Sequence, residues 1–201
     1  MHSRFSQDIK SLLERLANQP LTLADIIAET SERGFSLVIA IMVLPFLFPM
    51  PPGLTGVLGS VCFLLAMQMA LGRRSPWLPK KLAGFQFPDW FVRQLLQNLK
   101  RVTGVVEKIA RRRLINLAES PQVWRLNGVC ISWLTLLLIS PIPFTNPIPT
   151  VGILLFVVAT LEADGLLMCI SYVVTALITL LFGLIGYALW QAPSLLPNIF
   201  R

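Results

Sequence analysis

The sequence contains three long stretches without a single charged side chain. Residues 34–72, 126–161 and 165–200 hold no Asp, Glu, Lys or Arg, over 39, 36 and 36 residues. A membrane-spanning helix needs only about 20 mostly apolar residues, so each stretch is long enough to cross a bilayer at least once. Charged residues make up only 13% of the chain, against about 25% in soluble domains. The pattern predicts an all-α, polytopic membrane protein and argues against a water-soluble enzyme or a disordered chain.

Prolines interrupt the first two stretches. A helix cannot continue through several closely spaced prolines, so we expect separate helices on either side of each break. This divides the chain into a first proline-broken membrane hairpin over 34–72 and a second over 128–163. Each hairpin could span the membrane fully or be re-entrant; the 11 residues before Pro45 give only about 16 Å of helix, which favours a re-entrant break that lines a site. The break residues are Pro45, Pro49, Pro51, Pro52 and Gly53, then Pro141, Pro143, Asn146, Pro147 and Pro149.

The two hairpins resemble an internal repeat. Gly34 and Gly128 are 94 positions apart, as are Gln68 and Glu162. Paired, proline-interrupted apolar segments point to a binding site in secondary carriers, although chance convergence of Pro-rich and Leu-rich sequence is an alternative. Residues 73–125 offer no apolar span between the halves, so we expect parallel rather than inverted repeats.

The remaining segments flank the hairpins. Residues 1–33 predict N-terminal amphipathic helices, and residues 164–201 a C-terminal transmembrane helix and tail. Residues 73–127 carry twelve basic and three acidic side chains, which is typical of a cytoplasmic loop rather than a nucleic-acid patch. A basic amphipathic helix within this segment would lie on anionic lipids through Arg111, Arg112 and Arg113, or dock a partner protein. The N-terminus and residues 73–127 are then cytoplasmic, and Trp124 is placed as one of the interfacial anchors.

The sequence offers little material for catalysis. Its one histidine is His2, and no phosphate-binding glycine loop or nucleophile motif occurs. Cys62, Cys130 and Cys169 lie in apolar runs without metal-ligand spacing. We expect no enzyme activity, no catalytic residues, no metal site and no cofactor.

Polar groups within or beside the apolar stretches are the candidates for binding a substrate or an ion. An unpaired amide such as that of Gln68 would cost several kcal/mol in apolar surroundings, so it needs a partner. Helices that begin near Gly53 and Pro149 would aim unpaired N–H groups at the breaks. Glu162 and Asp164 could hold a proton or cation, although Asp164 before Gly165 more simply caps the final helix. The candidates are Pro49, Pro52, Gly53, Thr55, Gln68, Pro143, Asn146, Pro149, Thr150, Glu162 and Asp164.

Two sequence blocks resemble the ExoD family of bacterial exopolysaccharide-synthesis membrane proteins. The first block is ERGFSLVIAIMVLPFLFPMPPGLTGVLGSVCFLLAMQMALGRRSPWLPK from Glu32; the second combines PIPFTNPIP from Pro141 with LEADG from Leu161. Thr145 and Ala163 depart from the residues expected in this family. The resemblance implies a location in the bacterial inner (plasma) membrane and a role in making or exporting surface polysaccharide.

Three functional hypotheses remain open at this point. The leading one is a transporter-like or accessory component, dimeric, whose two breaks meet near the membrane midplane. The second is a noncatalytic scaffold that recruits the polysaccharide machinery. The third, an intramembrane transferase, would have to rely on Glu162 and Asp164 alone and is the weakest.

Overall fold

A computed structural model describes residues 34–47, 52–77, 79, 113–140 and 145–199. Every regular element in these ranges is a helix. The predicted N-terminal amphipathic helices and all of the predicted basic helix before Arg113 lie outside the described residues. The all-helical class predicted from the sequence is confirmed for the described part of the chain.

The first hairpin consists of α3 (Gly34–Val43), the 3₁₀ turn η2 (Leu44–Leu47) and α4 (Pro52–Ala70). As the sequence predicts, the α-helix ends before Pro45, at Val43, but a 3₁₀ turn that was not predicted continues the helical run to Leu47. A 3₁₀ turn accepts proline because its backbone φ lies in the range that the proline ring imposes. The run is therefore about 23 Å long rather than about 16 Å.

Helix α3 is enclosed by the rest of the protein. Every side chain from Phe35 to Phe46 is buried, and Ser36 is the only hydroxyl among them. A helix that is hydrophobic all round belongs in the interior of a larger assembly rather than on a water-facing surface. This placement accounts for the absence of charged residues from α3 and for Ser36 being its one polar side chain.

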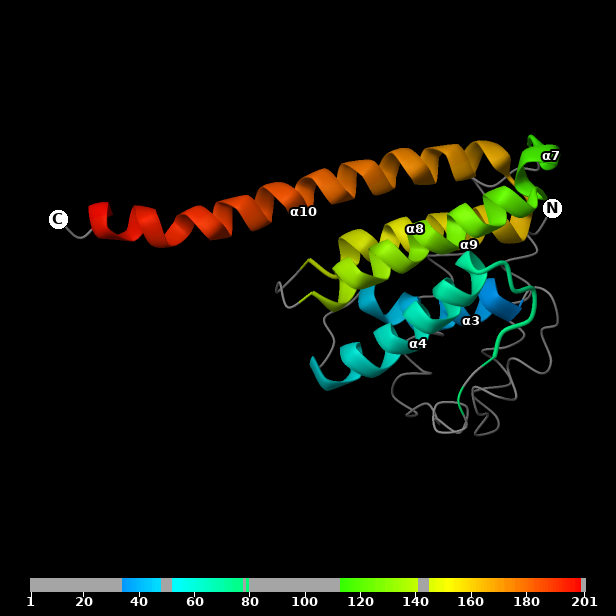
Figure 1. Ribbon diagram of the computed structural model, residues 1–201, viewed down its shortest axis with the longest axis horizontal. Helices are drawn as coiled ribbons and strands as arrows, with labels where there is room; N and C mark the ends of the chain where they lie inside the picture. The colour runs from blue at the N-terminus through cyan, green and yellow to red at the C-terminus, as the bar shows by residue number, and fades with distance from the viewer. Residues whose placement is uncertain (1–33, 48–51, 78, 80–112, 141–144, 200–201) are drawn as a thin grey trace.

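The second hairpin is formed by α8 (Pro121–Ile139) and α9 (Pro147–Glu162), preceded by the short α7 (Ile115–Ala118). Contacts connect α3 with α4, α4 with α8, α8 with α9, and α9 back to α3, so four helices close into one bundle. The colours in Figure 1 show that α3 and α8 begin at one end of this bundle, whereas α4 and α9 run back toward it. The two hairpins therefore run in the same direction.

The last helix, α10 (Gly165–Ile199), packs against α9 and extends past the bundle (Figure 1). By length and composition, two helices among the described residues could cross a membrane, namely Pro121–Ile139 and the Gly165–Gln191 part of α10. Shorter apolar helices cover Phe35–Leu47, Gly56–Ala70 and Pro147–Glu162. Large apolar side chains remain exposed along α10, among them Val173, Leu177, Leu180, Leu184 and Trp190.

Glycines permit the closest contacts between the helices. A Cβ atom built on Gly128 of α8 would lie 2.3 Å from the backbone nitrogen of Ala70 and 2.7 Å from the carbonyl carbon of Met69. A Cβ on Gly152 of α9 would meet a methyl carbon of Leu134 at 2.9 Å. The backbones of α4 and α8 thus touch directly at Gly128, as small residues allow in membrane-helix packing.

Candidate functional site

The structure divides the predicted binding residues between two ends of the bundle. We call the end that holds both proline breaks the break end, where η2, the start of α4, the end of α8 and the start of α9 lie. We call the opposite end the polar end (Figure 1). It holds the end of α4, the end of α9 and the starts of α7, α8 and α10. Helix α4 spans 19 residues, or about 28 Å. Gln68, Glu162 and Asp164 are therefore at the polar end, and they do not share a site with the breaks.

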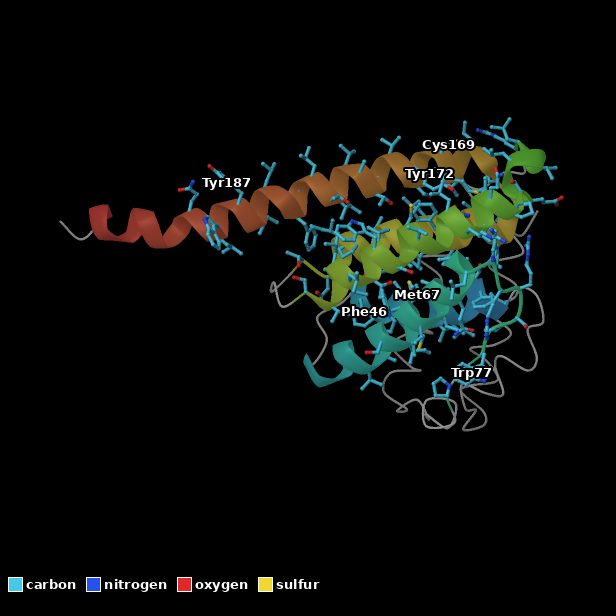
Figure 2. All side chains as sticks on the ribbon, viewed as in Figure 1. Phe46, Met67, Trp77, Cys169, Tyr172 and Tyr187 are labelled. Carbon is cyan, nitrogen blue, oxygen red and sulfur yellow. The ribbon has the colours of Figure 1, made fainter. Side chains whose placement is uncertain are left out.

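At the break end, η2 packs against α9. Pro52, Gly53 and Thr55 belong to the first turns of α4, and Pro49 and Pro143 lie outside the described residues. Pro149 and Thr150 are buried in the first turn of α9. Figure 2 shows Phe46 of η2 beside the bundle helices; its ring is fully buried.

Asn146 directly precedes α9 at the break end. It is half-buried at the N-cap position, and its side chain makes no capping hydrogen bond. Its carbonyl oxygen accepts a bond of 2.7 Å from the Thr150 hydroxyl. The commoner role of threonine, bonding back to its own helix, is therefore confirmed for Thr150.

The expected cluster of unpaired N–H groups at the start of α9 is wrong. Pro147 and Pro149 have no N–H to offer. The N–H of Ile148 donates to the carbonyl of Thr145 at 3.1 Å, and that of Thr150 donates to the carbonyl of Asn146 at 3.3 Å. The alternating prolines thus remove the anion site that a helix N-terminus would otherwise provide.

At the polar end, Gln68 finds its partner in the loop that follows α4. Its Nε2 donates to the Trp77 carbonyl at 2.7 Å, and its Oε1 accepts from the Trp77 N–H at 2.8 Å. The side chain is 8% exposed, so both bonds form away from bulk water. Gln68 therefore holds the loop against α4 through both ends of its amide.

Trp124 fixes the same loop from the side of α8. Its indole Nε1 donates to the Arg73 carbonyl at 3.1 Å, and the Arg74 guanidinium lies 4.9 Å from its ring centroid. Its ring meets Phe35 edge-on at 6.0 Å. Trp124 is only 8% exposed, so it packs between elements instead of anchoring at an interface as predicted. Trp77 is 60% exposed (Figure 2).

Asn127 is the centre of a polar contact between three helices. It was not among the candidate residues predicted from the sequence. It is fully buried, and its Oδ1 accepts a bond of 2.5 Å from the hydroxyl of Tyr172 in α10. Its Nδ2 lies 3.4 Å from Thr160 Oγ1 of α9 and 3.7 Å from the sulfur of Met168. An amide within a long uncharged stretch was the available signal, and it is the same signal that singled out Gln68 and Asn146.

The turn between α9 and α10 is built around Asp164. Its Oδ1 accepts the N–H groups of Leu166 and Leu167, each at 3.1 Å, which confirms the predicted helix cap. Ala163 adopts a left-handed conformation with φ of 52°, where glycine is usual, and the Asp164 N–H returns to the Ala159 carbonyl at 2.9 Å. Glu162 is the last residue of α9 and nearly buried.

The described residues contain no group of three or more His, Cys, Asp or Glu side chains placed to hold a metal ion. Cys62 is buried, Cys130 is half-buried and Cys169 is exposed, all as free thiols. The arrangement offers hydrogen-bonding groups at the break end and fixed arginines at the polar end.

Comparison with known proteins identifies the family. Residues 5–184 match the family described as "Exopolysaccharide synthesis, ExoD". This chain belongs to the ExoD family. It is 30% identical to Protein ExoD of Rhizobium meliloti (strain 1021), over 97% of this chain and 82% of that protein. It is also 27% identical to an uncharacterized protein of Synechocystis, over 99% and 95% of the two chains. No solved structure matches this member of the ExoD family.

Proposed function

We propose that this ExoD-family protein is a multi-pass protein of the bacterial inner membrane that acts in exopolysaccharide synthesis or export as a transporter-like component. The family description supports the link to exopolysaccharide synthesis. The observation that carries the transport proposal is that the described helix ends on both sides of each proline break lie at the same end of one closed bundle. Paired apolar segments that prolines interrupt are typical of substrate sites in secondary carriers.

The exposed side chains of α8 and α10 support a membrane location. The outer face of α8 presents five large apolar residues at helical spacing, and α10 continues this surface. Monomeric soluble proteins rarely expose contiguous apolar patches beyond a few hundred Å², whereas lipid tails accommodate them. On α8 these residues are Leu126, Val129, Trp133, Leu136 and Ile139.

The common direction of the two hairpins supports parallel repeats. Gln68 and Glu162, which correspond across the proposed repeat, both lie at the end of the second helix of their hairpin. In this topology the polar end and residues 73–127 are cytoplasmic, the breaks face the opposite side, and α10 crosses outward.

Within the proposed site, Asn146 is the residue best placed to contact a substrate. An amide carries both donors and acceptors, which suits the hydroxyl groups of a glycan. Because Asn146 makes no bond to cap its own helix, its side chain can turn to a ligand without breaking that helix end.

A noncatalytic scaffold is the second candidate function. Two observations favour it: α9 offers no unpaired N–H groups at its start, and the Gln68 amide is already bonded to Trp77. As a scaffold, the protein would recruit the polysaccharide machinery through its basic segment, including Arg111, Arg112 and Arg113, and could act as a homodimer.

Exopolysaccharide output separates the two candidates. In a host strain without its own copy, Asn146→Ala is expected to lower output roughly tenfold at unchanged protein abundance, as loss of a bond worth about 1.4 kcal/mol would predict. Gln122→Ala, an exposed amide at the other end of the bundle, is the matched control and should have no effect. Normal output from Asn146→Ala, together with loss on reversing the charges of residues 111–113, would contradict the transport proposal in favour of the scaffold.

A further inference from the structure

Three arginines are fixed in exposed positions at the polar end of the bundle. Arg73 and Arg74 follow α4, and Arg125 lies in the second turn of α8; all three side chains are exposed. We call these three residues the arginine platform.

The backbone under the platform is held at three points. Gly72 adopts a left-handed φ of 83°, which lets the N–H groups of Gly72 and Arg73 return to the carbonyls of Met69 and Gln68. Trp124 and the Gln68 amide then bind the backbone at Arg73 and at Trp77. The loop is therefore tied to both α4 and α8.

Two of the three guanidinium groups, those of Arg74 and Arg125, lie against neighbouring residues. That of Arg74 stacks on the Trp124 ring at 4.9 Å. That of Arg125 lies over Gly72, where its Nε would be 2.8 Å from an added Cβ. A cation at this place also meets the negative end of the α4 dipole. Because the Arg74 and Arg125 side chains already contact the protein, holding them on an anion costs less side-chain entropy than holding free side chains.

An apolar surface begins directly beside the platform. Leu71 is 72% exposed, and Met67 and Leu126 are exposed on the same ends of α4 and α8. The guanidinium group of arginine can donate two parallel hydrogen bonds to phosphate oxygens. Tryptophan side chains, such as the exposed Trp77, are common at the level of the lipid headgroups. A free phosphate ion would use the arginines alone, whereas a lipid would cover the apolar surface as well.

We propose that Arg73, Arg74 and Arg125 bind the phosphate headgroup of an anionic phospholipid whose acyl chains lie along α4 and α8 beside Leu71 and Leu126. The inference rests on the proposed membrane location but not on a role in polysaccharide synthesis. It differs from general attraction of a basic segment to the membrane because it requires a saturable site at three residues.

Lipid binding by the purified full-length protein tests this proposal. In phosphatidylcholine-containing micelles, fluorescent phosphatidylglycerol is titrated, and inorganic phosphate is the competitor. We expect saturable binding that Arg74→Gln combined with Arg125→Gln weakens at least roughly tenfold, the effect of about 1.4 kcal/mol. Lys10→Gln combined with Arg15→Gln, which removes two positive charges from the N-terminal segment, is the charge-matched control and should change affinity less than about twofold.

Three results would overturn the lipid site. Equal weakening by Lys10→Gln combined with Arg15→Gln would mean diffuse charge attraction, and full competition by inorganic phosphate would mean a free-anion site. Unchanged binding by the double variant would exclude the platform. Circular dichroism checks that the double variant is folded; if it is not, Arg73→Gln replaces it, since the Arg73 side chain is exposed and should weaken binding without affecting the fold. Polysaccharide output does not enter this assay, so failure of the proposed function leaves its result intact.

Discussion

Replacing Gly128 by alanine is expected to lower the free energy of unfolding by about 2 kcal/mol. The added methyl would lie 2.3 Å from the backbone nitrogen of Ala70, and a helix backbone cannot give way as a flexible side chain can. Overpacking of this kind costs about 1–3 kcal/mol or more, which outweighs the roughly 1 kcal/mol that alanine gains over glycine in helix propensity. Helices α4 and α8 must therefore separate locally.

Gly56 provides the matched control for this substitution. It lies in α4, one of the two helices that meet at Gly128, and an added Cβ at Gly56 would meet nothing within 4 Å. Gly56→Ala should therefore leave stability unchanged or raise it by up to about 1 kcal/mol. Denaturant titration of both variants in micelles, followed by circular dichroism, gives the comparison. Equal stability of Gly128→Ala and the unsubstituted protein would contradict the close packing of α4 on α8.

Replacing Asn127 by leucine is expected to lower the free energy of unfolding by about 2 kcal/mol. Leucine is similar in size but leaves the Tyr172 hydroxyl without its acceptor in a buried setting, and such a loss costs about 1–3 kcal/mol. Tyr172→Phe alone removes the same hydrogen bond and should lower the free energy of unfolding by about 1 kcal/mol.

A double-mutant cycle isolates the bond between the two residues. With Asn127→Leu and Tyr172→Phe combined, no polar group is left without a partner at this contact, so the combined cost should fall below the sum of the single costs by about 1 kcal/mol. Unfolding titrations of the four proteins measure this coupling. Strictly additive costs would mean that Asn127 and Tyr172 do not stabilise the packing of α8 on α10 through a shared bond.

The helices were predictable because their signals are local. Charge-free stretches, proline positions and the Asp164–Gly165 pair are visible in the sequence, and they located α4, α8, α9 and the start of α10 to within several residues. The 3₁₀ turn η2, which extends the helical run after α3 through Pro45, was missed because such a turn tolerates proline where an α-helix does not.

The site was less predictable because its geometry depends on contacts between distant segments. Gln68 and Asn146 give the same signal, an amide among apolar residues, yet one is bonded to Trp77 at the polar end and the other lies at the break end. The role of Gly128 depends on the register between α4 and α8, which no single segment encodes. Trp124 looked like an interfacial residue because it lies at the edge of an uncharged stretch, whereas its neighbours in space are Phe35 and the loop after α4.

The sidedness of the two bundle ends is the central claim, and cysteine labelling measures it directly. In a variant with Cys62, Cys130 and Cys169 replaced by alanine, single cysteines are placed at Ser75, at the polar end, and at Asn146, at the break end. A membrane-impermeant maleimide is then added to intact spheroplasts or to inverted vesicles. We predict that the cysteine at 75 reacts only in inverted vesicles and that the cysteine at 146 reacts only in spheroplasts. Reaction of both cysteines from the same side, or recovery of the protein in the soluble fraction, would contradict a bundle that crosses the membrane with its breaks facing outward.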